Sequence, residues 1–298
     1  MARQKLLATI MSACMSACMS ACAGSLAVAG AGAAPETAYF ASADGRTQLV
    51  GYLFVPSTAG PHPAVVMLHG RGGPYSSNVH QTCTLVAKDS SSPCNASTLS
   101  RRHAAWGAYW AERGYLALLP DSFGPRNKAH GFARFTHDNP ERDDVNERTV
   151  RPLDAEGALK YLQSRQDVTP EKVFLQGWSN GATTALNVMY RQTSLPSGGF
   201  RAAIALYPGC GRRALLSQDY KAASPVTIFL ASFDEEVSPA ICHRVFDAAE
   251  KRGEPVTVVE YVGATHGFDE PGRKRQSVDA NSTAREDVMR RAPALFGN

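Results

Sequence analysis

The sequence lacks a strong excess of charge of either sign. Its 31 lysines and arginines stand against 27 aspartates and glutamates, a formal net charge of +4, and without Arg3 and Lys5 near the N-terminus the balance is 29 to 27. So small an excess does not favour nucleic acid or a charged membrane surface as a partner. The basic cluster Arg273-Lys274-Arg275 is only a triplet, which is typical of solvated surface.

Metal-binding spacing, internal repeats and long apolar runs are also missing after the N-terminal segment. Six histidines show no spacing typical of a zinc site: His62, His80, His103, His130, His137 and His243. We therefore expect neither a metal ion nor a cofactor. No run beyond the first thirty-odd residues is long enough to span a bilayer. Residues 35–298 have the size of a single α/β domain with a large core.

Residues 1–34 are typical of a signal segment. Arg3 and Lys5 form a short positive region, and residues 6–29 are apolar and rich in small side chains. Ala27-Val28-Ala29 and Ala31-Gly32-Ala33 each offer a small-x-small cleavage site. We expect an exported protein, periplasmic or secreted. The repeated Met-Ser-Ala-Cys loosely resembles a lipoprotein signal, so a lipid anchor and a retained membrane anchor are the alternatives.

Cysteine is scarce after this segment, since only Cys83, Cys94, Cys210 and Cys242 follow it. An even number in an exported protein favours disulfides. We predict one bond between Cys83 and Cys94, inside a polar insertion at 76–100. We predict a second between Cys210 and Cys242, which ties the loop after one strand to a later helix. Buried thiols that form no bond are the alternative.

The pentapeptide Gly177-Trp178-Ser179-Asn180-Gly181 lies between a strand-like run, 173–176, and a helix-like run, 182–189. Gly-x-Ser-x-Gly in this context is typical of a nucleophile elbow. The turn is so sharp that the serine takes a strained conformation, and the two glycines let the chain pass without a clash. The pattern alone occurs by chance in roughly one such chain in six, so a plain turn with an idle serine is the alternative.

An acid and a histidine follow the serine in the order that such hydrolases use. Asp234 comes just after the apolar run 226–231, and catalytic groups gather at the carboxyl ends of parallel strands. His266 stands among small residues after the run 256–261. We therefore predict Ser179 as nucleophile, His266 as base and Asp234 as the acid that orients it. The adjoining Glu235 and Glu236 are the alternatives for the acid.

The oxyanion hole is expected beside this serine. A tetrahedral oxyanion needs preorganised N–H donors, and one of them is the N–H of Asn180, the residue after the nucleophile. The second comes from the glycine-rich loop 69–74, which follows a buried strand-like run. We predict the N–H of Arg71, with Gly70 or Gly72 as alternatives.

Strand-like and helix-like runs alternate along the chain. This favours an α/β fold with a doubly wound, mostly parallel sheet and helices on both faces. Residues 49–55 are expected to open the sheet as an antiparallel edge strand. Parallel strands are expected near 64–69, 115–120, 173–177, 202–206, 226–231 and 256–261, and helices near 101–113, 153–165, 180–191, 239–252 and 283–295.

The polar segment 121–147 is expected to form a loop beside the active site. We predict that its side chains, together with one from the elbow, contact the substrate. The candidates are Phe123, Arg126 and Trp178, with Phe132 and Phe135 as further lining residues. A solvated loop that is anchored by buried phenylalanines is the alternative.

Together these motifs resemble the dienelactone hydrolase family of α/β-hydrolases, from about residue 45 to the end. Residues 118–126 are similar to its Asp-Ser-Phe segment, 150–155 to its Arg-x-x-Asp-Ala segment and 261–269 to its histidine loop. The founding members carry cysteine where Ser179 stands, so the base matters more here, and dienelactone itself is not carried over as the substrate.

The family's acid loop is one residue shorter before its Ser-Pro pair. Counting back from Pro239 by the family's spacing reaches Glu235, which is the main rival to Asp234. The resemblance implies an α/β-hydrolase fold and a carboxylic ester hydrolase.

We predict an exported serine esterase that opens a small-molecule ester or lactone through an acyl-enzyme, with no nucleic-acid partner and no stable membrane partner unless lipidated. A peptidase or acyltransferase with the same triad is one alternative. A noncatalytic exported binding protein that kept the fold is another. The sequence leaves the oligomeric state open.

Overall fold

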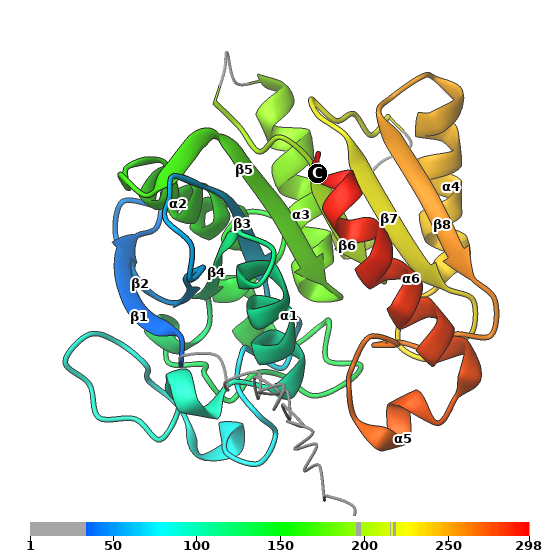
Figure 1. The fold of residues 1–298 in the computed structure, drawn as a ribbon. Helices are drawn as coiled ribbons and strands as arrows, with labels where there is room; N and C mark the ends of the chain where they lie inside the picture. Colours follow the sequence, from blue (N-terminus) through cyan, green and yellow to red (C-terminus); the bar gives the residue numbers. More distant parts are fainter. Residues whose placement is uncertain (1–33, 195–197, 215, 217–218, 298) are drawn as a thin grey trace, which may run out of the picture. The chain divides into compact units, whose positions relative to one another are not determined.

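The computed structural model describes residues 34–194, 198–214, 216 and 219–297 (Figure 1). The predicted signal segment therefore lies outside the described residues, apart from Ala34. The chain from Ala34 onward forms one unit, and its named strands belong to one eight-stranded sheet. The strands are β1 (Glu36–Ala41), β2 (Gln48–Phe54), β3 (His62–Leu68), β4 (Leu116–Asp121), β5 (Val168–Trp178), β6 (Ala203–Leu206), β7 (Val226–Ala231) and β8 (Val256–Tyr261).

The strand order is β1-β2-β4-β3-β5-β6-β7-β8. β2 pairs antiparallel with both β1 and β4, and all other neighbours pair parallel. The predicted, mostly parallel α/β sheet is confirmed. The prediction that residues 49–55 form the edge strand is wrong, because β1 lies outside them. In β1 only the side chain of Phe40 is buried.

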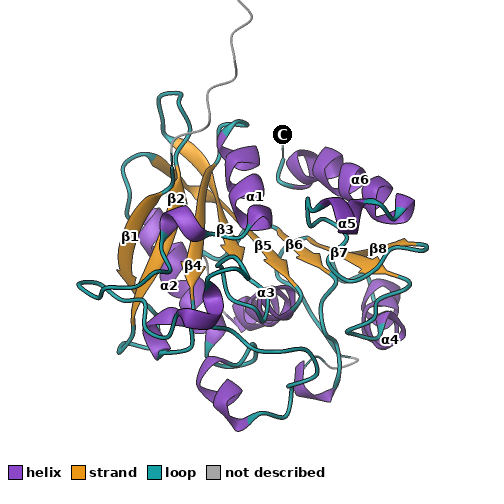
Figure 2. Ribbon diagram, turned by 90° about the horizontal axis from the view of Figure 1, so that it is seen from below, coloured by secondary structure: helices purple, strands orange, loops and turns teal. Residues whose placement is uncertain are grey.

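Helices cover both faces of the sheet, with α1 and α6 on one face and α2, α3 and α4 on the other (Figure 2). Such cover is what a sheet that is buried on both faces requires. The helices are α1 (Arg101–Ala111), α2 (Arg151–Gln163), α3 (Asn180–Arg191), α4 (Pro239–Lys251), α5 (Arg273–Gln276) and α6 (Asp279–Leu295). The five predicted helices are present, and the single turn α5 is an addition.

Two hydrophobic cores lie on the two faces of the sheet. In β3, Val66 and Leu68 belong to the core under α2, α3 and α4, whereas Val65 and Met67 belong to the core under α1 and α6. Successive strand residues point to opposite faces, so one apolar run serves both cores. The central strands thus hold their carboxyl ends rigidly in place.

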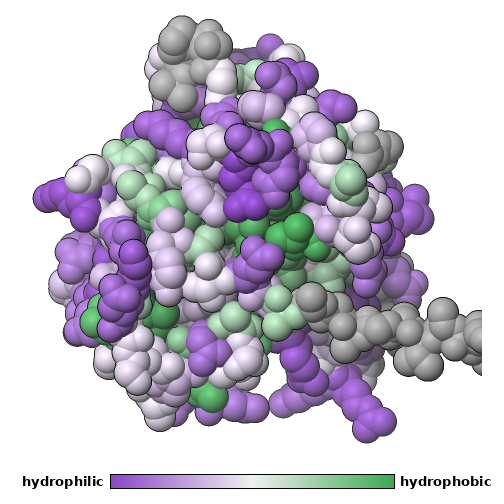
Figure 3. All heavy atoms as spheres, turned by 60° about the vertical axis from the view of Figure 1, so that its left-hand side comes forward, coloured by the Kyte–Doolittle hydropathy of each residue, from purple (hydrophilic) through white to green (hydrophobic). Residues whose placement is uncertain are grey.

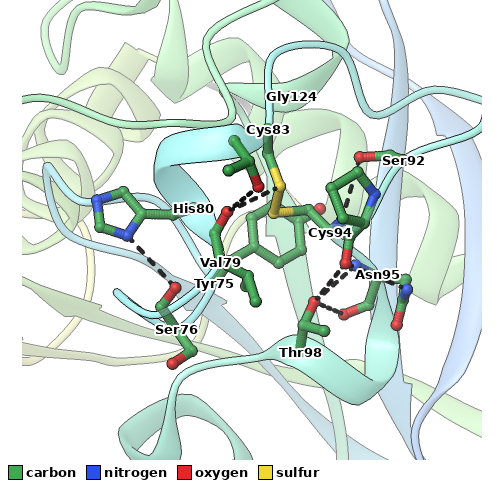
Figure 4. The surroundings of a disulfide bond; sticks show 12 residues. Tyr75, Ser76, Val79, His80, Cys83, Ser92, Cys94, Asn95, Thr98 and Gly124 are labelled. Atoms are coloured by element: carbon green, nitrogen blue, oxygen red, sulfur yellow. Dashed lines mark hydrogen bonds between the residues drawn. A yellow bond between two sulfur atoms is a disulfide. The ribbon is translucent and has the colours of Figure 1, made fainter.

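Both predicted disulfides are present. Cys83 and Cys94 close a loop in the insertion that follows β3, and both pack in the same core as Tyr75 (Figure 4). Cys210 follows β6 and is bonded to Cys242 in α4. The first bond closes a loop within one insertion, and the second joins the segment after β6 to α4.

The surface carries mixed polarity. On the face shown in Figure 3, a hydrophobic area near the middle is bordered by hydrophilic side chains. Across the part of the chain that the structure describes, none of the helices has the length and apolar character needed to cross a membrane.

Candidate active site

The elbow forms where β5 ends at Trp178 and α3 begins at Asn180. Ser179 between them has φ 53° and ψ −117°, a region that costs a non-glycine residue about 1–3 kcal/mol. A Cβ on Gly177 would lie 2.3 Å from the carbonyl oxygen of Gly181, and one on Gly181 would lie 2.0 Å from that of Leu68. Glycine is therefore required at both positions, and the predicted strained turn is present.

Three side chains meet at the carboxyl edge of the sheet. Ser179 Oγ lies 2.9 Å from Nε2 of His266, and Nδ1 of His266 lies 2.8 Å from Oδ2 of Asp234. The side chains of His266 and Asp234 are 8% and 1% exposed. Ser179, His266 and Asp234 come after β5, β8 and β7 respectively. This is the geometry of a hydroxyl, a base within hydrogen-bond reach and a third group that orients the base.

Glu235, the rival acid, has a different partner. Its Oε2 accepts a hydrogen bond from the backbone N–H of His266 at 2.9 Å, and its Oε1 accepts one from Arg275 at 3.3 Å. Burial opposes ionisation, but the backbone donors and Arg275 outweigh it and hold the pKa of Glu235 below its usual value. The acid hydrogen-bonded to the imidazole is Asp234, while Glu235 fixes the backbone of the histidine loop.

A further carboxylate, Glu236, lies beside the base. Its Oε2 is 3.8 Å from Nε2 of His266, and Nε of Arg71 donates to the same oxygen at 3.0 Å. Arg134 pairs with its other oxygen at 2.7 Å. Burial would raise the pKa of Glu236, but the hydrogen bond from Arg71 and the nearby positive charges lower it. No pattern in the sequence distinguishes Glu236 from the acids next to it.

The glycine-rich loop after β3 passes directly beside the elbow. A Cβ on Gly70 would lie 3.6 Å from Cβ of Ser179 and 3.4 Å from the carbonyl oxygen of Trp178. Asn180 begins α3, and its side chain is held by Arg151 and, at 2.7 Å, by Glu147. Both backbone segments predicted to donate N–H groups thus flank the serine. The assignment of Asn180 and Arg71 as the donors stays a prediction.

None of the three predicted substrate contacts, Phe123, Arg126 and Trp178, lines either cavity next to Ser179. Phe123 and Trp178 are fully buried. Arg126 pairs with Asp154 at 2.8 Å and with Asp44 at 3.2 Å. Its charge is neutralised by acids that lie far away in the sequence. The two further lining candidates do border a cavity, Phe132 in one and Phe135 in another.

Asp269 supports the site from behind, a role that the sequence did not reveal. Its Oδ2 accepts the indole N–H groups of Trp106 and Trp178, each at 2.8 Å, and its Oδ1 accepts the hydroxyl of Tyr207 at 2.5 Å. The Tyr207 ring packs edge-on against the imidazole of His266, with centroids 4.7 Å apart. One buried carboxylate therefore joins the elbow, α1 and the loop of the base.

Two cavities open at the serine, one of about 740 Å³ and one of about 1160 Å³. Ser179, Arg71 and Glu236 line both of them. The Arg71–Glu236 ion pair therefore stands at the boundary between the two. A substrate attacked by Ser179 has room on either side of its reacting carbon.

This mixed sheet, with a serine at a strand–helix elbow and a histidine and an acid at the same edge, defines an α/β-hydrolase. The model of the dienelactone hydrolase family matches residues 101–298. The chain belongs to the dienelactone hydrolase family and is a hydrolase that acts on esters.

Solved structures share the fold at low sequence identity. A Klebsiella pneumoniae protein provisionally called a dienelactone hydrolase has 15% identity and a TM-score of 0.65, over 89% of this chain and 99% of its own. A dienelactone hydrolase-like promiscuous phosphotriesterase from metagenomic libraries has 18% identity and a TM-score of 0.63, over 88% and 98%. A propionate-bound esterase of Thermogutta terrifontis has 20% identity and a TM-score of 0.56, over 87% and 94%.

Proposed function

We propose that the protein is an exported serine hydrolase that cleaves carboxylic esters or lactones through an acyl-enzyme. The observation that carries the proposal is the position of His266, whose two ring nitrogens lie 2.9 Å from Ser179 Oγ and 2.8 Å from Asp234 Oδ2. A serine hydroxyl is a weak nucleophile until a base takes its proton. Here the base is in reach, and its opposite nitrogen is held by a buried carboxylate.

The position of His266 between Ser179 and Asp234 supports a two-step reaction. Nε2 of His266 takes the proton of Ser179 Oγ as that oxygen attacks the ester carbon, and the N–H groups of Asn180 and Arg71 stabilise the oxyanion. The carbon–alcohol bond then breaks, and Nε2 returns the proton to the leaving oxygen. Water then attacks the acyl-serine and loses a proton to His266. The bond between the acyl carbon and Ser179 Oγ breaks, Nε2 returns the proton to Oγ, and the acid leaves. Asp234 keeps the imidazole in the required tautomer and stabilises its charged form.

The proposal is tested by replacing the nucleophile. Ser179→Ala should lower kcat for a p-nitrophenyl ester at least about a thousandfold, given what removal of a triad member costs. Ser57→Ala, an exposed serine in the loop between β2 and β3, should retain full activity. More than a few per cent of activity in Ser179→Ala, measured on protein shown to be folded, would contradict the proposal.

An organophosphate separates catalysis from binding without a known substrate. A Thermogutta terrifontis esterase of the same fold has been captured phosphorylated by paraoxon. Paraoxon should add one diethylphosphoryl group to Ser179 of this protein, detectable by peptide mass. A noncatalytic binding protein would leave Ser179 unmodified.

A peptidase is the second candidate, because a puromycin-hydrolysing peptidase of Mycobacterium tuberculosis shares the fold. This chain covers only 40% of that chain. An ester and an anilide of the same acid distinguish an esterase from a peptidase. An esterase should have a much higher kcat/KM for the ester than for the anilide. Export is tested separately, by cell fractionation and by the N-terminal sequence of the mature chain.

A further inference from the structure

The first residue of α2, Arg151, is a fully buried arginine that contacts both backbone segments flanking Ser179. One terminal nitrogen, Nη1, donates a hydrogen bond to Oδ1 of Asn180 at the start of α3. The other, Nη2, donates to the backbone carbonyl of His69 at 2.7 Å. A single planar guanidinium thus joins α3 to the glycine-rich loop 69–74.

Arg151 lines neither of the cavities that open at Ser179. The centroid of the Phe123 ring lies 5.1 Å from its Cζ. Burial lowers the pKa of Arg151 to about 10, against the opposing effect of Asp154 and Glu147, so the side chain is charged at neutral pH. Hydrogen bonds from a charged donor are stronger than neutral ones, and a planar guanidinium fixes the directions of its donors. Arg151 therefore holds its two acceptors firmly without contacting a substrate.

The peptide that carries the N–H of Arg71 is held in turn by the side chain of His69. The backbone N–H of Ser122 donates to Nε2 of His69 at 3.2 Å, so this nitrogen is an acceptor and carries no proton. Burial and the charge of Arg151 hold the pKa of His69 well below its usual value, so the proton of the neutral ring is on Nδ1. Nδ1 donates to the carbonyl oxygen of Gly70 at 2.8 Å. Because the Gly70–Arg71 peptide is planar and trans, fixing this carbonyl also fixes the N–H of Arg71.

The start of α3 and the glycine-rich loop meet at the carbonyl that Arg151 holds. A Cβ on Gly181 would lie only 2.5 Å from the carbonyl oxygen of His69. An oxyanion hole requires its donors about 3 Å from the oxyanion, and a misplacement of about 1 Å can cost roughly a hundredfold in rate. The contacts of Arg151 therefore determine a separation on which the rate of the proposed reaction depends.

We infer that Arg151 is a positioning residue of the oxyanion hole. Its guanidinium holds the start of α3 and the glycine-rich loop at a fixed separation, so that the N–H groups of Asn180 and Arg71 both point at the oxygen of the tetrahedral intermediate. The inference rests on the proposed function, because it takes these two N–H groups as the oxyanion donors. It assigns a role in the rate of ester cleavage to a buried side chain outside the triad.

Two substitutions test the inference. Arg151→Lys keeps the charge but replaces two terminal nitrogens with one, and Arg151→Met removes both donors. In each folded variant kcat for p-nitrophenyl acetate should fall about 10- to 100-fold, while KM changes less than about threefold. The matched control is Arg165→Lys, which breaks a two-pronged ion pair with Asp167 just after α2 and lines neither cavity, and it should keep the wild-type kcat.

A second measurement separates positioning from a general loss of structure. Ser179 Oγ adds to the carbonyl carbon of 1,1,1-trifluoropropan-2-one, its proton passes to Nε2 of His266, and the carbonyl oxygen becomes an oxyanion. The inhibition constant of this ketone should therefore rise in the Arg151 variants by about the factor by which kcat/KM falls. An unchanged inhibition constant, or a kcat within about threefold of wild type in folded Arg151→Met, overturns the inference while the proposed function stands.

Asn180→Ala keeps the backbone N–H but removes the acceptor of Arg151, and it decides the matter if the Arg151 variants do not fold. It should lower kcat at least about fivefold and raise the inhibition constant in parallel, and wild-type values would overturn the inference. Where all variants fold, Asn180→Ala should add less than about threefold to the effect of Arg151→Met, because both remove the same hydrogen bond. If the wild-type protein hydrolyses no ester, the proposed function fails and the inference falls with it.

Discussion

The indole N–H of Trp178 donates a hydrogen bond of 2.8 Å to Oδ2 of Asp269. Trp178 is the residue directly before Ser179, and Asp269 lies three residues after His266. The two chain segments that carry the proposed nucleophile and base are therefore joined by a contact that is fully buried. The distance between Ser179 and His266 therefore depends on this hydrogen bond as well as on the positions of β5 and β8 in the sheet.

Asp269→Asn should destabilise the protein by about 2–4 kcal/mol. An amide offers one acceptor oxygen in place of two, so either Tyr207 or both Trp106 and Trp178 lose their acceptor. Buried hydrogen bonds to a charged group contribute about 1.5–3 kcal/mol each. The free energy of unfolding in urea measures this. The surface variant Asp247→Asn, which loses only an exposed contact with His243, should change it by less than about 1 kcal/mol, and equal effects would contradict the role given to Asp269.

The strain at Ser179 predicts an order of stability among inactive variants. With φ at 53°, alanine keeps the unfavourable conformation and glycine relieves it. Ser179→Gly should be more stable than Ser179→Ala by about 1 kcal/mol, and neither should hydrolyse esters. Parallel urea titrations compare the two. If alanine proves as stable as glycine, the elbow stores no strain.

The candidate triad at the carboxyl edge of the sheet was predictable because each of its residues lies next to a recognisable local sequence pattern. Apolar runs predicted the strands of the parallel sheet, and each candidate triad residue comes shortly after one of them. The exposed strand β1 was missed because Phe40 alone is buried there. A local pattern therefore marks the loop at the end of a buried strand, but it does not mark an edge strand whose side chains face water.

The side chains around the triad could not be predicted in the same way. Arg126 was expected to contact the substrate, but Asp44 and Asp154 pair with it, and their proximity arises only from the fold. Asp269 likewise gains its role from donors on three separate elements. A single sequence contains no local pattern that predicts which residues far apart along the chain come into contact.

Buried His103 predicts a loss of stability in mild acid. Burial lowers the pKa of His103 to about 4, and Arg102 and Arg151 act in the same direction. Because this value lies below the unfolded value of about 6.5, the neutral ring stabilises the fold fully above pH 6.5, and this stabilisation is lost as the pH falls toward 4. At about 1.4 kcal/mol per pKa unit, the loss by pH 4.5 is about 2–3 kcal/mol.

Comparison with His103→Gln isolates this effect from the titration of carboxylates. The advantage of wild type over the variant should shrink between pH 7.5 and 4.5 in urea unfolding. His243 provides a control of opposite sign, because Asp247 and Glu260 outweigh its burial and raise its pKa. The advantage of wild type over His243→Gln should grow as the pH falls. An advantage over His103→Gln that is constant with pH would show that His103 is protonated equally in the folded and unfolded states.

The two disulfides should contribute unequally. They span separations of 32 residues for Cys210–Cys242 and 11 residues for Cys83–Cys94, and the entropy of loop closure favours the longer by about 1 kcal/mol. Replacing both cysteines of the longer bridge with serine should therefore lower the free energy of unfolding more than replacing both of the shorter. It should also lower kcat/KM more, because Cys210 borders the smaller cavity and Cys242 lies in the helix that comes after the loop of Asp234. Alkylation before and after reduction, read by mass, first verifies the bonds, and four reactive thiols in unreduced protein would contradict both.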